Sequence, residues 1–286
     1  MRADRGGLCR FPDGVRRWLV LALMLLAAAG PVQPPGKAAV PAVKAGDIAE
    51  QLAMLAFDAN PLWAIPARER LARWVGPVRL FLFGRAEDRA DAQAALLALG
   101  RASGLRTQIM GAAEAAAVPP NAFVVADAHI AAAMRGPLRG MLVNAFSGDE
   151  ATIEAFLATV VEVTPCWMLP VWADAERSVI RAAVIGVDAT GPREATRACV
   201  LRGLGAALGP MGPGAFLRGS ALAPGTAARL SREDERMLRV LYGRALHPGM
   251  GRAEVIAAAQ KALSAGGGAG PGARKPKNRA KTPGAR

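Results

Sequence analysis

The segments CVLRGLGAALG, residues 199–209, and SREDERMLRVLY, residues 231–242, decide the fold of this chain of 286 residues. The second segment begins with a serine and has an acid three residues later. In that pattern the hydroxyl of Ser231 accepts a free backbone N–H, and the carboxylate of Asp234 lies at the positive end of the helix. The pattern therefore predicts a helix that begins at Ser231.

Both segments belong to a longer region, Arg193 to Leu263, for which we predict a layer of helices. The first helix covers 194–209, a loop rich in Pro and Gly runs to Leu230, and a last helix follows Pro248-Gly249-Met250. Apolar residues of the middle helix recur at spacings of three and four, which predicts one buried face: Met237, Leu238, Leu241 and Tyr242.

Upstream of this layer we predict a small sheet with helices packed on it. Residues 78–83, bounded by Pro77 and Gly84, are β-branched and aromatic and give the clearest strand. Further strands are predicted at 107–110 and 121–126, with a hairpin at 166–169 and 179–187; helices are predicted at 47–57, at 86–102 and after an N-cap at Ser147. Because strands and helices alternate at first and helices then follow, the order favours an α+β fold with a small mixed sheet and a helical C-terminal layer.

The net charge of +13 is concentrated at the two ends of the chain. Residues 1–17 and 265–286 together carry nine of these thirteen charges, so the body from 18 to 264 is only mildly basic. A body without a dense basic stripe offers little to a phosphate backbone. Weak contact with a membrane surface or with nucleic acid is therefore expected only through the C-terminal tail.

The N-terminal 29 residues have the form of a secretory signal peptide. Arg16 and Arg17 precede an apolar run of twelve residues, 18–29, which ends in small residues and is too short to span a membrane. We expect cleavage near Ala29 and a periplasmic or secreted protein. The alternative is a protein anchored in the inner membrane through residues 18–29.

The remaining chain divides by composition into three parts. Residues 30–45 are predicted to be a disordered linker, and residues 46–264 a single α+β domain. Residues 265–286, rich in Gly, Pro, Lys and Arg, cannot bury enough apolar surface to offset their conformational entropy and are predicted to be a disordered basic tail. No bundle of transmembrane helices is expected.

Three cysteines are present, and Cys9 lies in the segment that we expect to be removed. Cys166 and Cys199 then remain as an even pair in an oxidising compartment, for which a disulfide is the natural expectation. Two buried thiols are the alternative.

Patterns of common catalytic sites are absent from the sequence. His129 and His247 are its only histidines, which excludes a helix with two zinc-ligating histidines at i and i+4. Gly203-x-Gly205 is followed by the wrong spacing for a dinucleotide-binding fingerprint. We therefore expect no metal site, no cofactor and no recognisable catalytic residue.

Three blocks of the C-terminal region resemble a known family. They are CVLRGLGAALGPM at 199–211, LSREDERMLRVLY at 230–242 and LHPGM at 246–250. Together they look like the proteobacterial exported family called domain of unknown function 2927, whose first block typically reads CLHEELAQALGPLND. The resemblance is firm over about 193–255 and looser from Asp47. It implies an exported protein and names no activity, because the activity of the family is unknown.

The chain differs from the family pattern at the positions where the family has polar side chains that could take part in catalysis. The family's His-Glu-Glu, Gln and Asn-Asp are replaced here by Leu201, Arg202 and Gly203, by Ala206, and by Gly212 and Pro213. The family helix also looks weakly like half of a zincin-type zinc peptidase, and zinc hydrolysis needs ligands and a general base on that helix. The substitutions therefore imply that a zincin-like arrangement would be degenerate in this chain.

These observations lead to two hypotheses of different classes. The first is an exported, non-catalytic binding or interaction module of the cell envelope, whose partner is an envelope protein or an anionic polymer. The second is a cell-envelope hydrolase of unrecognised type, a degenerate relative of metallopeptidases, with Asp127, His129 or Asp234 in its site. A nucleic-acid-binding protein is a third class, and it depends on the basic tail alone.

Overall fold

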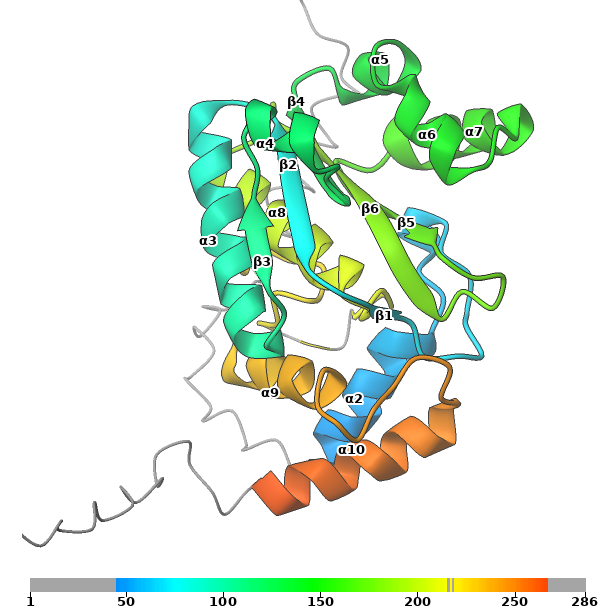
Figure 1. Ribbon diagram of the computed structural model, residues 1–286, viewed down its shortest axis with the longest axis vertical. Coiled ribbons are helices and arrows are strands. Elements are labelled where there is room, and N and C mark those ends of the chain that lie inside the picture. Colours follow the sequence, from blue (N-terminus) through cyan, green and yellow to red (C-terminus); the bar gives the residue numbers. More distant parts are fainter. Residues whose placement is uncertain (1–44, 215–216, 218, 267–286) are drawn as a thin grey trace, which may run out of the picture. The chain divides into compact units, whose positions relative to one another are not determined.

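The computed structural model describes residues 45–214, 217 and 219–266, and it contains a sheet of six strands covered by helices (Figure 1). The strands are β1 (Arg73–Trp74), β2 (Val78–Phe83), β3 (Thr107–Ile109), β4 (Ala122–Asp127), β5 (Cys166–Trp172) and β6 (Val179–Asp188). All paired strands run parallel except β5, which is antiparallel to β6. The sheet is therefore mixed, and the predicted α+β fold is confirmed.

The strand order places β4 between β2 and β6, with β3 beyond β2 and β5 beyond β6. The start of β6 also pairs with the short strand β1. Among the strands that the structure describes, β5 pairs with β6 alone, so its outer edge has no neighbouring strand.

The strands have the burial patterns that their sequences favour. In β2 the buried residues Val78, Leu80 and Leu82 alternate with partly exposed ones, because successive side chains of a strand point to opposite faces of the sheet. The middle of β6, residues 183–187, is buried on both faces, as is usual for a strand of a sheet covered by helices on both sides.

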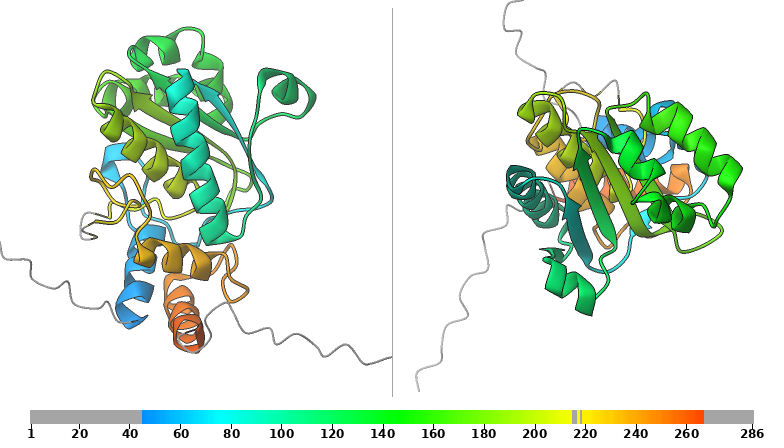
Figure 2. Two further views of the ribbon diagram at one scale, coloured as in Figure 1. Left: turned by 90° about the vertical axis from the view of Figure 1, so that its left-hand side faces the viewer. Right: turned by 90° about the horizontal axis from the view of Figure 1, so that it is seen from above.

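Helices cover the sheet and close both of its ends. Helices α3 (Ala86–Ser103) and α8 (Arg193–Ala207) lie side by side over one face (Figure 2). At one end of the strands lie α5 (Ile130–Arg135), α6 (Arg139–Ala145) and α7 (Glu150–Phe156), and α9 (Arg232–Leu241) lies at the other end (Figure 1).

Short helical elements were not predicted from the sequence. They are η1 (Pro61–Trp63), α4 (Ala112–Ala117), α5 and α6. One or two turns are too short for a helical period to stand out in the sequence.

The helical C-terminal layer is present, and the first helix of the described chain belongs to it. Helices α9 and α10 (Arg252–Gly266) pack against α2 (Ala45–Phe57) (Figure 1). Arg252 at the start of α10 pairs with Asp58 just after α2, with 2.6 Å between Nη1 and Oδ1. The predicted helix at 47–57 is therefore confirmed as α2, but it packs with the last helices and not only on the sheet.

Helix α9 begins as its sequence predicts. The Oγ of Ser231 accepts the backbone N–H of Asp234 at 3.0 Å, and Oδ2 of Asp234 accepts the N–H of Ser231 at 2.8 Å. Met237, Leu238 and Leu241 are each at most 1% exposed. The capped start is confirmed, and the buried face is confirmed at these three residues, whereas Tyr242 is only partly buried.

The predicted N-cap at Ser147 was wrong. Ser147 and Gly148 have left-handed φ angles of 53° and 79° and form a turn before the helix. The N-cap of α7 is Asp149, whose Oδ1 accepts the N–H of Thr152 at 3.2 Å. Asp149 takes this role because it is the residue with extended backbone immediately before the first helical turn.

Parts of the sequence-based domain scheme lie outside the described residues. These parts are the signal peptide at 1–29, the linker up to residue 44 and the tail beyond residue 266. The described residues fall in one compact unit, Val43–Arg286. No helix among them is both long enough and apolar enough to cross a membrane.

Tyr242, the only tyrosine of the chain, connects the end of α9 to α8 and β1. Its hydroxyl donates to the carbonyl of Leu208 at 2.7 Å and accepts the N–H of Trp74 at 3.1 Å. The guanidinium of Arg73 lies over the ring, 4.7 Å from its centre. Burial raises the pKa of Tyr242 well above its ordinary value.

We therefore expect no phenolate absorbance from the folded protein at about pH 10.5, where an exposed tyrosine is largely ionised. A raised pKa means that the folded state holds the proton more tightly than the unfolded state does. The stability that Tyr242 contributes is thus complete below about pH 10 and is lost as the pH rises further. A spectrophotometric titration measures this, and the protein unfolded in urea is the control. Normal ionisation near pH 10 without unfolding would contradict the buried hydroxyl.

Candidate functional site

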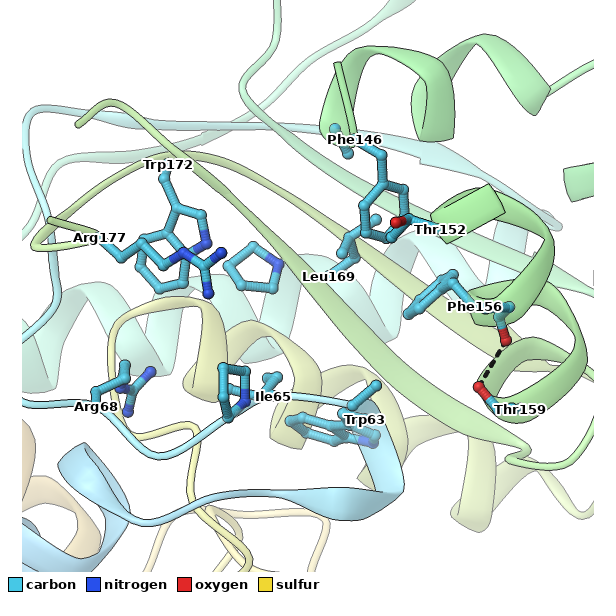
Figure 3. Close-up of a pocket in the computed structure, with 15 residues that line it drawn as sticks. Trp63, Ile65, Arg68, Phe146, Thr152, Phe156, Thr159, Leu169, Trp172 and Arg177 are labelled. Carbon is cyan, nitrogen blue, oxygen red and sulfur yellow. Dashed lines mark hydrogen bonds between the residues drawn. The ribbon is translucent and has the colours of Figure 1, made fainter. Parts of the chain in front are cut away.

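A pocket of about 360 Å³ lies between η1 with the loop that follows it, helices α6 and α7, and the β5–β6 hairpin (Figure 3). We call it the aromatic pocket. Its volume is in the range of small-molecule sites, roughly 300–1,000 Å³. Its lining is mostly apolar and consists of Trp63, Ala64, Ile65, Pro66, Arg68, Ala145, Phe146, Thr152, Ala155, Phe156, Thr159, Leu169, Pro170, Trp172 and Arg177.

The rings of the pocket are held by contacts with one another and with the core. The ring of Phe156 lies 5.4 Å from that of Phe146 and 5.5 Å from that of Trp167, in the second case edge to face. Trp167 is completely buried. Since aromatic pairs at such distances stabilise one another, the apolar wall is a fixed surface rather than a loose collection of side chains.

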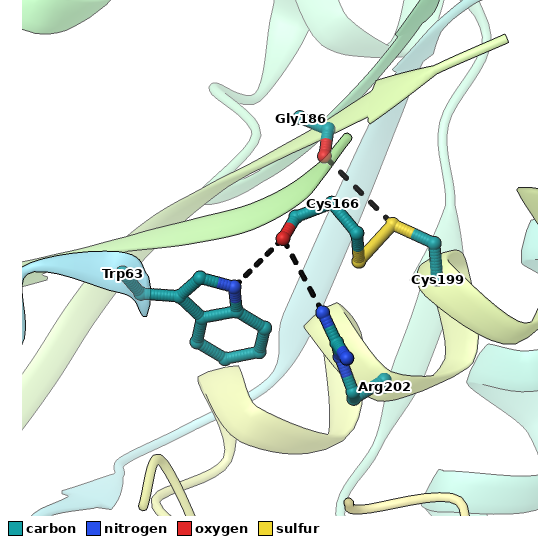
Figure 4. Close-up of a disulfide and its surroundings, with 5 residues drawn as sticks. All are labelled: Trp63, Cys166, Gly186, Cys199 and Arg202. Atoms are coloured by element: carbon teal, nitrogen blue, oxygen red, sulfur yellow. Dashed lines mark hydrogen bonds between the residues drawn. A yellow bond between two sulfur atoms is a disulfide. The ribbon is translucent and has the colours of Figure 1, made fainter. Parts of the chain in front are cut away.

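Trp63 is fixed by polar contacts at the start of β5. Its Nε1 donates to the carbonyl oxygen of Cys166 at 2.7 Å (Figure 4). The same oxygen accepts a hydrogen bond from Nη2 of Arg202 at 3.3 Å, and the guanidinium of Arg202 lies 4.9 Å from the centre of the Trp63 ring. Cation–π contact and the shared acceptor therefore hold this indole in one orientation.

The residue that anchors Trp63 is itself anchored by a disulfide. Cys166 in β5 is bonded to Cys199 in α8, with 5.6 Å between the two Cα atoms (Figure 4). The predicted disulfide is confirmed, and the alternative of two free thiols was wrong. The bond ties the strand at the free edge of the sheet to the helix that covers it.

The residues of α8 that replace the family's motif residues pack against the core or hold a neighbouring side chain in place. Leu201 and Ala206 are 2% and 1% exposed. A Cβ at Gly203 would lie 2.4 Å from Cγ2 of Ile185, so no side chain fits there. Arg202 borders another cavity, of about 570 Å³, beside the disulfide. Desolvation lowers the pKa of its guanidinium, which is engaged by the Cys166 carbonyl and the indole.

Strained backbone is concentrated around the aromatic pocket. In the described part of the chain, the non-glycine residues with left-handed φ are Ala64 at 53°, Ser147 at 53° and Arg177 at 55°. Ala64 and Arg177 line the pocket, and Ser147 follows Phe146, which also lines it. Each such residue costs about 1–3 kcal/mol, and these residues cluster at ligand sites and active sites. This pocket is therefore the best candidate for a functional site.

In the part of the chain that the structure describes, the lining of the aromatic pocket includes two cations and no acid. The guanidinium of Arg68 donates to backbone carbonyls at the end of α2 and after α8, and its pKa is lowered by burial to about 10, so it stays charged at neutral pH. Arg177 is exposed, and its guanidinium makes no hydrogen bond or ion pair with any residue that the structure describes.

The residues named for a hydrolase do not form a common site. Asp127 ends β4 and accepts the backbone N–H of His129 at 2.6 Å. Asp234 is buried at the start of α9, where its carboxylate accepts hydrogen bonds from Ser220 and from two backbone N–H groups. Within the described ranges, no group of three or more His, Cys, Asp or Glu side chains could hold a metal ion.

Sequence reasoning missed the aromatic pocket, because the rings that line it are far apart in the sequence. Aromatic residues make up only 5% of the chain, and four of these fourteen rings, Trp63, Phe146, Phe156 and Trp172, line this one pocket. They come from segments up to 109 residues apart, so nothing in their spacing indicates that they meet.

The comparisons with known proteins give one match. The family model described as "Protein of unknown function (DUF2927)" matches residues 47–261. No curated protein and no solved structure matches the chain.

Proposed function

The chain belongs to the family described as a protein of unknown function (DUF2927), and we propose that this member is an exported, non-catalytic binding module of the cell envelope. The aromatic pocket is the proposed binding site. The observation that carries the proposal is the meeting of four aromatic rings and two residues with strained backbone, Ala64 and Arg177, in the lining of one pocket.

Export is supported by the disulfide, because disulfides persist in oxidising compartments and are rare in the cytoplasm. The proposal includes a signal peptide at 1–29, a linker at 30–45, one domain at 46–264 and a disordered basic tail at 265–286. The mature protein is then periplasmic or secreted. Retention in the inner membrane through residues 18–29 is the alternative.

Binding without turnover is supported by the chemistry of the pocket. General acid–base catalysis needs a group that gains and loses a proton near neutral pH. The titratable side chains of the lining are Arg68 and Arg177, and an arginine stays protonated at that pH. The lining also contains the hydroxyls of Thr152 and Thr159, and that of Thr159 donates to the carbonyl of Ala155 at 2.6 Å.

The partner in this proposal is a ligand or protein of the envelope, or an anionic polymer. The basic tail adds weak attraction to anionic surfaces. The hydrolase hypothesis differs in one measurable respect, because a zinc-type enzyme would carry stoichiometric zinc in the purified mature protein.

Filling the aromatic pocket with one large side chain is expected to weaken ligand binding strongly. The probe is N-phenyl-1-naphthylamine, an uncharged fluorophore that brightens in apolar surroundings. The wild-type protein should bind it saturably at one site, and Ala155→Trp should lower the affinity by at least about tenfold, because the indole takes the space of the ligand. Fluorescence titration measures both constants.

The matched control is Ala158→Trp. Ala158 is also exposed and lies three residues further on, outside the lining of the pocket. This variant should bind the probe as the wild type does. Equal loss in both variants, or no saturable binding by the wild type, would contradict the proposed site.

A further inference from the structure

We propose that the ligand of the aromatic pocket is a small amphiphilic carboxylate, whose apolar body lies against the rings and whose carboxylate is bound by Arg177. The inference rests on the proposed function, since it assumes that the pocket is a binding site. It adds the chemical class of the ligand and the residue that recognises its charge.

The charge of the pocket favours an anion. Among the described residues that line the pocket there is no carboxylate, so none of them neutralises the two arginines. Arg68 is committed to the carbonyls of Ala56 and Gly209. Arg177 has no partner among the described residues and keeps all its guanidinium donors available.

The placement of the lining residues favours an amphiphile. In Figure 3, Arg177 lies beside Trp172 at one end of the pocket, and Phe156 and Thr159 lie at the opposite end. The surface between them carries apolar groups of Ile65 and Leu169. A molecule with an anionic head and an apolar body would therefore match the cation at one end and the rings beyond it.

Arg177 is held in place before any ligand arrives. It lies in the turn between β5 and β6, where the carboxylate of Asp174 accepts the N–H groups of Ser178 and Val179, each at 3.0 Å. Desolvation opposes ionisation of Asp174, but these hydrogen bonds and that of the Ser178 hydroxyl lower its pKa overall. The N–H of Arg177 itself donates to the carbonyl of Asp174 at 3.3 Å. Such a turn maintains the left-handed backbone of Arg177 and reduces the entropy that binding would otherwise cost.

The size of the site and the unpaired guanidinium of Arg177 specify the ligand further. A planar guanidinium can donate two parallel hydrogen bonds to one carboxylate. A volume of about 360 Å³ is near the lower end for small-molecule sites, which favours a single short chain or ring system over a polymer segment. We therefore assign a monocarboxylate with an apolar body.

The test compares two competitors of the same length that differ in charge. Decanoate and decanol are each titrated against the wild-type protein carrying N-phenyl-1-naphthylamine, and their displacement constants are compared. Decanoate should bind more tightly than decanol, and Arg177→Gln should reduce this preference about fivefold to tenfold, the loss expected for one charge-assisted hydrogen bond at an exposed site. Arg177→Lys should retain part of the preference, because it keeps the charge.

The matched control is Arg181→Gln, which removes an exposed arginine of β6 outside the pocket and should leave the preference for decanoate unchanged. A wild-type protein that binds the probe but shows no preference for decanoate overturns the inference and leaves the proposed function standing. A protein that does not bind the probe contradicts both. Stronger displacement by decyl phosphate, or by a hydrophobic tripeptide with a free carboxyl end, would also overturn the assignment.

Discussion

Replacement of Asp234 by alanine is expected to lower the free energy of unfolding by about 3–4 kcal/mol, the cost of several buried donors left without an acceptor. The carboxylate is completely buried and accepts hydrogen bonds from the hydroxyl of Ser220 and from the N–H groups of Ala221 and Ser231. It thereby joins the start of α9 to the irregular segment that precedes it. Urea denaturation monitored by circular dichroism measures the loss.

Glu235→Ala is the matched control for Asp234→Ala. Glu235 is the next residue in the first turn of α9, and it is exposed. Its removal takes away only a favourable interaction with the helix dipole and should cost less than about 1 kcal/mol. Equal effects of the two variants would mean that the charge of the first turn, and not the buried network, stabilises this region.

Loss of the disulfide is expected to have a similarly large effect. Cys166 and Cys199 are 33 residues apart, and closing a loop of this length stabilises a protein by about 3–4 kcal/mol on the chain-entropy model. The double variant Cys166→Ser/Cys199→Ser should therefore unfold at a lower urea concentration than the wild type. It should also bind the fluorescent probe less tightly, because the Cys166 carbonyl that positions Trp63 is no longer fixed to α8.

Two further measurements separate the disulfide from other effects of the substitutions. A reductant should destabilise the wild type to about the level of the double variant and should not affect the double variant. Alkylation before and after reduction of protein isolated from cells counts the free thiols. Two thiols alkylated without reduction would contradict both the disulfide and export to an oxidising compartment.

The features that were predicted correctly from the sequence are those with local causes. The start of α9 follows from Ser231 and Asp234, three residues apart, and the strand at 78–83 follows from its β-branched and aromatic residues and its Pro and Gly boundaries. The disulfide is not local, but Cys166 and Cys199 are the pair that remains once Cys9, in the predicted signal peptide, is set aside. Each of these three predictions depended on only a few residues.

The features that were missed depend on contacts between distant segments. The order of the strands is decided by packing of whole layers, and the chain gives no marker for it. The aromatic pocket brings Trp63 together with Phe156 and Trp172, and only the fold places these rings side by side. The role of Arg202 was equally hidden, because its acceptor belongs to β5 and its ring partner to η1.

The outer edge of β5 has a consequence for the behaviour of this protein at high concentration. Unpaired strand edges can recruit a second molecule and start aggregation. The N–H of Ala183 in β6 donates to the carbonyl of Asn121, on the β4 side of β6. Pro170 of β5 lies opposite Ala183, so its carbonyl points away from β6. Proline also has no N–H to donate to an incoming strand. Cys166 points its carbonyl the same way, and that oxygen is already occupied by Trp63 and Arg202. Trp63 and Pro170, which line the pocket, thus also reduce the number of backbone groups that β5 offers to a second molecule.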